Sequence, residues 1–124
     1  MVKSYRDLRV WQASMELVER VYGVTREFPK HEVYALCSQM QRAAVSIPSN
    51  IAEGHAREHL KEYLHHLSMA QASLAELETQ LEISLRLGYI RGEVFNQFFD
   101  FTQSLARQLR SLRISLSKSV ITNT

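Results

Sequence analysis

The chain has 124 residues, of which 45% are hydrophobic and 23% charged. This composition is typical of one globular domain, here expected over residues 1–124, and argues against disorder. No stretch approaches the roughly 20 apolar residues of a membrane-spanning helix, and the first residues lack the apolar core of a signal peptide, so we expect a cytoplasmic protein outside the membrane. A single cysteine excludes an internal disulfide and a multi-cysteine zinc site, and four glycines are too few for a turn-rich β domain.

The first predicted helix covers residues 8–27. One face is marked by side chains at spacings of three and four, the period of an amphipathic helix. These side chains are Leu8, Trp11, Met15, Val18, Val21 or Tyr22, and Thr25. Ser4 and Asp7 resemble a capping box ahead of this helix. Pro29 ends the helix, because the residue before a proline avoids the α region.

The second predicted helix covers residues 32–53. Its apolar seam consists of Val33, Cys37, Met40, Ala44, Ile47 and Ile51. Pro48 interrupts the helix at a cost of about 3 kcal/mol, because it removes one amide and leaves the carbonyl of Ala44 without a partner. Either the helix kinks there or two shorter helices meet there, and we favour the kink because the seam keeps its phase. Gly54 is expected to close the helix in a left-handed conformation.

The third and fourth predicted helices cover residues 59–87 and 93–116. The third seam consists of Leu60, Tyr63, Leu67, Ala70, Leu74, Leu77 and Leu81. The fourth consists of Phe98, Thr102, Leu105, Leu109, Leu112 and Leu116. Gly88 is expected to end the third helix in a Schellman cap, and residues 117–124 are expected to form a polar, frayed tail.

Short connections between long amphipathic helices place consecutive helices antiparallel to each other. No segment shows the alternating pattern of a β-strand. The sequence therefore predicts an all-α protein with an up-down-up-down four-helix bundle.

Residues 38–54 read SQMQRAAVSIPSNIAEG, residues 67–78 read LSMAQASLAELE, and residues 7–11 read DLRVW. These three segments resemble a known family, the bacterial four-helix bundle proteins that are also called 23S rRNA intervening-sequence or S23 proteins. The resemblance extends over residues 4–115. Ala56 and His59 depart from the family pattern, since a glycine and a serine are usual there, and this removes a good N-cap from the third helix. Ala72 also departs from it, because a glycine is usual at this position before Ser73.

The resemblance implies a left-handed bundle that assembles as a ring-like homopentamer. The accessory protein of diversity-generating retroelements is a remote relative in this comparison, and it is a basic pentamer that binds nucleic acid and a reverse transcriptase. For the intervening-sequence branch itself, the resemblance implies no biochemical activity.

Several polar residues lie close to Pro48 in the sequence, within the segment that carries the family motif. These residues leave three interpretations open. In the first, serine or asparagine side chains satisfy the freed carbonyl of Ala44, directly or through water, while Arg42 pairs with Glu53 or a neighbour. In the second, the group lies at a subunit interface or ring lumen, and in the third it binds a ligand. The candidate interface residues are Arg42, Ser46, Pro48, Asn50, Glu53 and Gly54.

The sequence gives little support for catalysis or for a metal site. His55 and His59 have the spacing of a chelating pair, but no third ligand stands at a motif spacing. Cys37 lies on an apolar seam without an organised histidine, whereas a catalytic thiol needs such a partner. We therefore expect neither an enzyme nor a bound cofactor or metal.

The net charge of +2 hides an uneven distribution. Residues 53–90 carry three basic and six acidic side chains, whereas residues 91–124 carry five basic and two acidic ones. After Asp100 only basic residues follow: Arg107, Arg110, Arg113 and Lys118. The leading hypothesis is a non-enzymatic homo-oligomer that binds RNA, DNA or a nucleic-acid-processing partner through this basic face. The alternative is a scaffolding oligomer that binds a protein partner without nucleic acid. This alternative is favoured if acidic side chains of the third helix pair with the basic side chains of the fourth.

Overall fold

The computed structural model describes residues 2–122, with side chains as far as residue 118. All regular structure in this part of the chain is helical, and four α-helices and two short 3-10 helices account for it. The α-helices are α1 (Arg9–Thr25), α2 (Leu36–His55), α3 (Leu60–Arg86) and α4 (Gly92–Thr122). The 3-10 helices are η1 (Tyr5–Asp7) and η2 (Lys30–Glu32).

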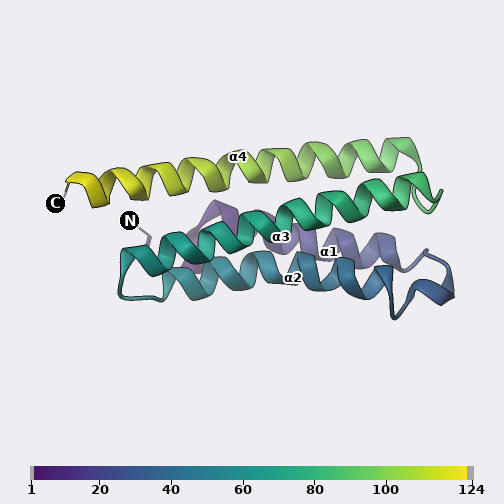
Figure 1. Ribbon diagram of the computed structural model, residues 1–124, viewed down its shortest axis with the longest axis horizontal. Coiled ribbons are helices and arrows are strands. Elements are labelled where there is room, and N and C mark those ends of the chain that lie inside the picture. The colour runs from purple at the N-terminus through teal and green to yellow at the C-terminus, as the bar shows by residue number, and fades with distance from the viewer. Residues whose placement is uncertain (1, 123–124) are drawn as a thin grey trace.

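The four α-helices run up, down, up and down in one bundle (Figure 1). Each helix packs on the next in the chain, and α1 closes the bundle by packing on α4. The contact between α2 and α3 is the most extensive. The predicted all-α four-helix architecture is therefore confirmed.

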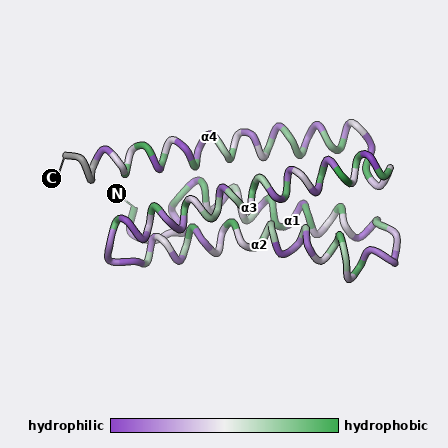
Figure 2. Tube along the Cα trace, in the orientation of Figure 1, coloured by the Kyte–Doolittle hydropathy of each residue, from purple (hydrophilic) through white to green (hydrophobic). Residues whose placement is uncertain are grey.

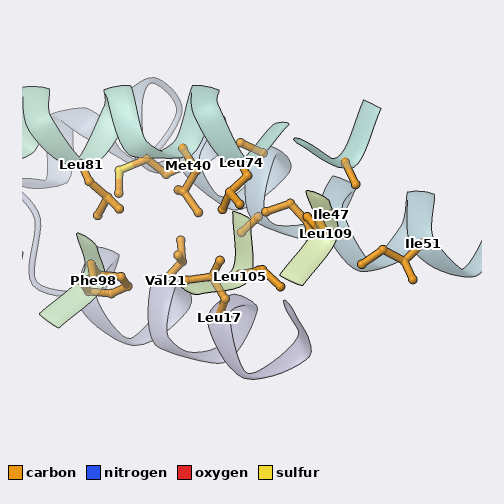
Figure 3. Close-up of a cluster of buried hydrophobic side chains, with 14 of the residues drawn as sticks. Leu17, Val21, Met40, Ile47, Ile51, Leu74, Leu81, Phe98, Leu105 and Leu109 are labelled. Atoms are coloured by element: carbon orange, nitrogen blue, oxygen red, sulfur yellow. The ribbon is translucent and has the colours of Figure 1, made fainter. Parts of the chain in front are cut away.

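The core lies along the central axis of the bundle, and all four helices contribute to it (Figure 3). Its largest fully buried side chains include Leu17, Met40, Ile47, Leu74, Leu105 and Leu109. Burying a side chain of this size stabilises the fold by roughly 1.5–3 kcal/mol. Hydrophobic and hydrophilic stretches alternate along each helix, and the α2–α3 turn is hydrophilic (Figure 2).

The predicted seams of α2, α3 and α4 match most of the buried residues, whereas the predicted seam of α1 is correct only in part. Val21 and Thr25 are buried as predicted, and Leu8, Trp11 and Val18 are partly buried against the core. The side of α1 that faces the core consists of Val10, Ser14, Leu17, Val21 and Thr25. Met15 of the predicted seam is 39% exposed. Because α1 carries two adjacent apolar stripes, periodicity alone selected the stripe that lies over α2 rather than the one that faces the axis.

The start of α2 also differs from the prediction. We expected the helix from residue 32, but η2 and a turn come first and α2 begins at Leu36. Val33, the first residue of the predicted seam, is consequently exposed. The side chain of Thr25 at the end of α1 accepts a hydrogen bond from Gln41 Nε2 at 3.2 Å, which ties α2 to α1 just after this connection.

One helix runs through Pro48, so the alternative of two shorter helices is wrong. The predicted left-handed cap at Gly54 is also wrong, because Gly54 lies inside α2 and Gly88 is the only described glycine with a positive φ. Gly54 serves close packing instead. A Cβ atom there would lie 2.7 Å from Cβ of His66 on α3.

The turn after α3 is the predicted Schellman cap. Gly88 adopts φ 78°, its amide donates to the carbonyl of Leu85 at 3.0 Å, and the amide of Tyr89 donates to the carbonyl of Ser84 at 2.9 Å. At the start of α3, His59 is the N-cap residue and its side chain makes no capping hydrogen bond, as expected from the loss of serine there.

The last helix is longer than predicted. We expected it to end at residue 116, but α4 continues to Thr122, and its C-terminal turns project beyond the other three helices (Figure 1). The expected frayed tail thus overlaps a helical segment, and residues 123–124 of that prediction lie outside the described residues.

Candidate nucleic-acid interface

The fold gathers basic side chains at the end of the bundle that holds both termini (Figure 1). We call this region the basic end and define it as residues 2–10, 53–62 and 106–118. It contains nine Lys/Arg and four Asp/Glu residues, whereas the rest of the chain contains six and nine. The basic residues are Lys3, Arg6, Arg9, Arg57, Lys61, Arg107, Arg110, Arg113 and Lys118.

The predicted arginines of α4 do not form one continuous face. A spacing of three residues rotates each side chain by about 60° around a helix with 3.6 residues per turn. Arg107 lies beside α1, Arg110 is exposed, and Arg113 is half-buried and donates a hydrogen bond to Oε1 of Gln71 on α3. Lys118 is exposed further along the helix.

The acidic residues of α3 do not neutralise α4 within the chain. Glu78 accepts hydrogen bonds from Thr102 Oγ1 and Gln103 Nε2 of α4, both at 2.7 Å, which are uncharged groups. Glu82 pairs with Arg86 on its own helix at 3.2 Å. No ion pair among the described residues joins an acid of α3 to Arg107, Arg110 or Arg113 of α4. Within residues 2–122, the acids of α3 therefore do not neutralise these three arginines.

A groove runs between the start of α1 and the middle of α4. Its volume is about 380 Å³. Its wall includes the guanidinium-bearing Arg9 and Arg107, and neither side chain makes an ion pair or hydrogen bond with the described residues. The groove is lined by Leu8, Arg9, Val10, Ser104, Arg107, Gln108, Ser111 and Leu112.

The sequence-based hypothesis missed the contribution of the N-terminal segment. Lys3, Arg6 and Arg9 are far from α4 in sequence, and the antiparallel arrangement of α1 and α4 brings them to the same end. Arg6 lies over the ring of Trp11 at 5.6 Å. A capping box fixes the segment: Ser4 Oγ accepts from the amide of Arg6 at 3.2 Å, and the Asp7 carboxylate accepts from the amide of Ser4.

Two of the family-motif residues, Ser46 and Asn50, contact α3 through their side chains, and the exposed Glu53 lies beside the same contact. Ser46 Oγ lies 2.8 Å from Ser73 Oγ, and Asn50 Nδ2 donates to Ser46 Oγ at 3.0 Å. Asn50 Oδ1 lies 3.0 Å from Nδ1 of His66, and that nitrogen lies 3.8 Å from the Glu53 carboxylate. These contacts form a polar network that aligns α2 with α3 inside one chain.

The direct contacts expected around Pro48 differ from those in the structure. Asn50 Nδ2 donates to the carbonyl of Ser46 at 2.9 Å rather than to that of Ala44. Glu53 lies beside His66, and Arg42 is exposed and makes no ion pair with a described residue.

A second groove, between α1 and α2, is mainly apolar. It has a volume of about 280 Å³ and includes Pro48. Its wall carries Met15 and Val45, which are 39% and 40% exposed. Tyr22, 41% exposed, lines a neighbouring hollow with Arg42. Of the six motif residues, Pro48 lines the apolar groove, and Arg42 and Ser46 line the neighbouring hollow.

The remaining candidates have structural surroundings. His55 packs edge-on against Tyr63, with ring centroids 5.8 Å apart. Burial raises the pKa of the Cys37 thiol, and its Sγ lies 3.6 Å from the carbonyl of Thr25. Within residues 2–122, no three His, Cys, Asp or Glu side chains gather where they could hold a metal ion. In the same part of the chain, no helix is both long and apolar enough to cross a membrane.

The family assignment agrees with these features. The family model of the 23S rRNA-intervening sequence proteins matches residues 6–111. The chain belongs to this family. A solved structure from the S23 ribosomal protein family of Bacteroides thetaiotaomicron, described as a protein with unknown function, has the same fold. It superposes with a TM-score of 0.78 at 22% sequence identity, covering 84% of this chain and 94% of the other. No curated protein matches the chain.

Proposed function

We propose that this intervening-sequence protein is a non-enzymatic, oligomeric helical bundle that binds nucleic acid through its basic end. The observation that carries the proposal is the separation of charge: nine basic and four acidic residues at one end, six and nine elsewhere. A field of this kind attracts a polyanion to one end of the molecule. The arginine-bearing turns of α4, which the sequence analysis identified, lie at this end beside the start of α1 and the first half of α3.

The chemistry of such an interface is electrostatic. Lysine and arginine side chains that contact phosphates release condensed counterions, so the affinity falls as salt rises. Phosphate contacts carry no sequence information directly, and we therefore expect weak sequence preference. A homo-oligomer, with the pentamer implied by the family resemblance as the expected state, presents the basic end once per subunit, and the contacts of its copies add through avidity.

The test reverses charge at the basic end without disturbing packing. Arg107→Glu with Arg110→Glu changes two exposed side chains that have no ion pair with the described residues and leaves the half-buried Arg113 in place. Lys30→Glu with Arg91→Glu is the matched control, because it makes the same charge change at two exposed sites of the opposite end.

In a gel-shift at about 50 mM salt, where screening is weak, wild type and control should retain RNA or DNA. The basic-end variant should lose the shift while its circular dichroism spectrum is unchanged. Absence of a shift for wild type, or equal loss for both variants, would refute the proposal.

The second candidate function is a scaffold that holds a protein partner without nucleic acid. The apolar groove between α1 and α2 favours it, since solvent-exposed apolar grooves rimmed by polar residues mark interaction sites. Pro48 in this groove and Arg42 in the neighbouring hollow support the interface interpretation of the family motif, which we keep as part of the proposal. Wild-type protein that assembles but binds no nucleic acid would select this candidate.

A further inference from the structure

The groove between α1 and α4 combines positive charge with a hollow that could hold part of a ligand. Two guanidinium groups, from Arg9 and Arg107, border a hollow whose other walls are apolar and small polar side chains. A volume of about 380 Å³ falls in the range of roughly 300–1,000 Å³ that small-molecule sites occupy. A flat basic surface would bind phosphates without such a hollow.

The chemistry of the walls divides into two parts. Leu8, Val10 and Leu112 supply an apolar surface, against which a planar base can pack. Ser104, Gln108 and Ser111 supply hydroxyl and amide groups, and Gln108 Nε2 donates to Ser104 Oγ at 3.2 Å. Arginine is suited to the phosphate beside such a base, because its planar fork can donate two hydrogen bonds at once.

The backbone adds to the same positive surface. α1 begins beside the groove, and its N-cap residue Leu8 makes no side-chain hydrogen bond to the first turn. The first amides of a helix carry a partial positive charge. The amides of Leu8 and Trp11 already donate to the carbonyls of Tyr5 and Leu8, so those of Arg9 and Val10 are the ones that favour an anion beside Arg9.

We propose that the α1–α4 groove receives one nucleotide of a single strand, with the base on its apolar wall and the phosphate between Arg9 and Arg107. This inference rests on the proposed function and names the form of nucleic acid that the basic end prefers. In a duplex the bases are stacked and paired, so a base reaches such a groove only after unpairing, which costs a few kcal/mol. Single-stranded nucleic acid offers the base without that cost.

The test compares a labelled oligouridine of about twelve nucleotides, within the site sizes of single-strand binders, with an RNA duplex of the same length. Arg9→Gln with Arg107→Gln removes both groove charges. The control, Lys3→Gln with Arg110→Gln, removes equal charge from exposed sites outside the groove lining. Ser111→Phe fills the groove without changing charge.

Wild type should bind the single strand about tenfold more tightly than the duplex, the difference made by roughly 1.4 kcal/mol. The groove double variant and Ser111→Phe should each lose this preference, while the control keeps it with a uniformly lower affinity. Equal binding of both probes by wild type, or equal effects of the two double variants, would overturn the groove inference and leave the proposed function standing. Absence of binding to either probe would overturn both.

Discussion

At Gly54 the backbone of α2 lies against α3, and the missing side chain is what permits this approach. The nearest atoms to an added Cβ are Cβ of His66 at 2.7 Å and Cδ1 of Tyr63 at 3.0 Å. A Cβ atom cannot swing away as the end of a flexible side chain can. The polar network of Ser46, Asn50 and His66 begins one turn away, so its geometry depends on the same approach.

Gly54→Ala should therefore destabilise the protein, although alanine is the better helix former. Overpacking costs about 1–3 kcal/mol, which exceeds the gain of about 0.5–1 kcal/mol from replacing glycine inside a helix. Gly23→Ala is the control, because Gly23 lies in α1 with nothing within 4 Å of an added Cβ, and it should stabilise the protein. Urea unfolding measures both changes. A Gly54→Ala protein that is more stable than wild type would contradict the close approach.

At the scale of elements, the end of the bundle opposite the termini is held by a contact between the α1–α2 connection and the α3–α4 turn. Tyr89 donates from its hydroxyl to Glu32 Oε2 at 2.8 Å, and its ring lies 5.2 Å from that of Phe28. The hydrogen bond from Tyr89 lowers the pKa of the Glu32 carboxyl below its ordinary value of 4.5. The bond also raises the pKa of the Tyr89 hydroxyl.

This contact predicts a pH-dependent contribution to stability. A carboxyl whose pKa is lower in the folded state stabilises the fold above its unfolded pKa, and the contribution is lost as the pH falls through the folded pKa. Tyr89→Phe should therefore unfold at lower urea than wild type near pH 7, and the difference should shrink below about pH 4.5. A difference that is absent at pH 7, or equally large at pH 3, would contradict this role.

The elements also show what periodicity can and cannot predict. In α3 only one apolar seam, from Leu67 to Leu81, fits the helical period. Periodicity therefore identifies the buried side of α3 correctly. In α1 the stripes that contain Leu17 and Met15 fit the same period, and only packing against α2 and α4 selects between them. The role of Gly54 was likewise outside the reach of sequence, because it depends on an atom of another helix.

For the whole molecule, the sequence predicted the part of the basic end that α4 contributes but not the part that the N-terminal segment contributes. The acid-free stretch after Asp100 indicated a basic C-terminal face, but the spacing of the arginines distributes them around α4. Arg9 joins Arg107 only because α1 and α4 are antiparallel neighbours. Long-range proximity of this kind follows from topology, which a single sequence specifies only through the complete fold.

The exposed apolar surface of α1 and α2 predicts self-association. We expect light scattering to show a homo-oligomer at micromolar concentration. Val45→Lys should dissociate it, because a charge in the groove beside Pro48 would be buried without a partner. Ile83→Lys adds the same charge at a site on α3 that is 41% exposed, against 40% for Val45. A monomeric wild type would refute assembly, and dissociation by Ile83→Lys alone would place the interface elsewhere.

The most direct measurement of the central claim is the salt dependence of binding, followed by fluorescence anisotropy with a labelled single strand. If the basic end contacts phosphates, the logarithm of the association constant falls linearly with that of the salt concentration, with a slope of about −0.7 per contact. The Arg107→Glu, Arg110→Glu variant should show a shallower slope than wild type, and the Lys30→Glu, Arg91→Glu control an unchanged one. No binding by wild type at about 50 mM salt, where screening is weak, or an affinity that does not change with salt, would contradict the claim.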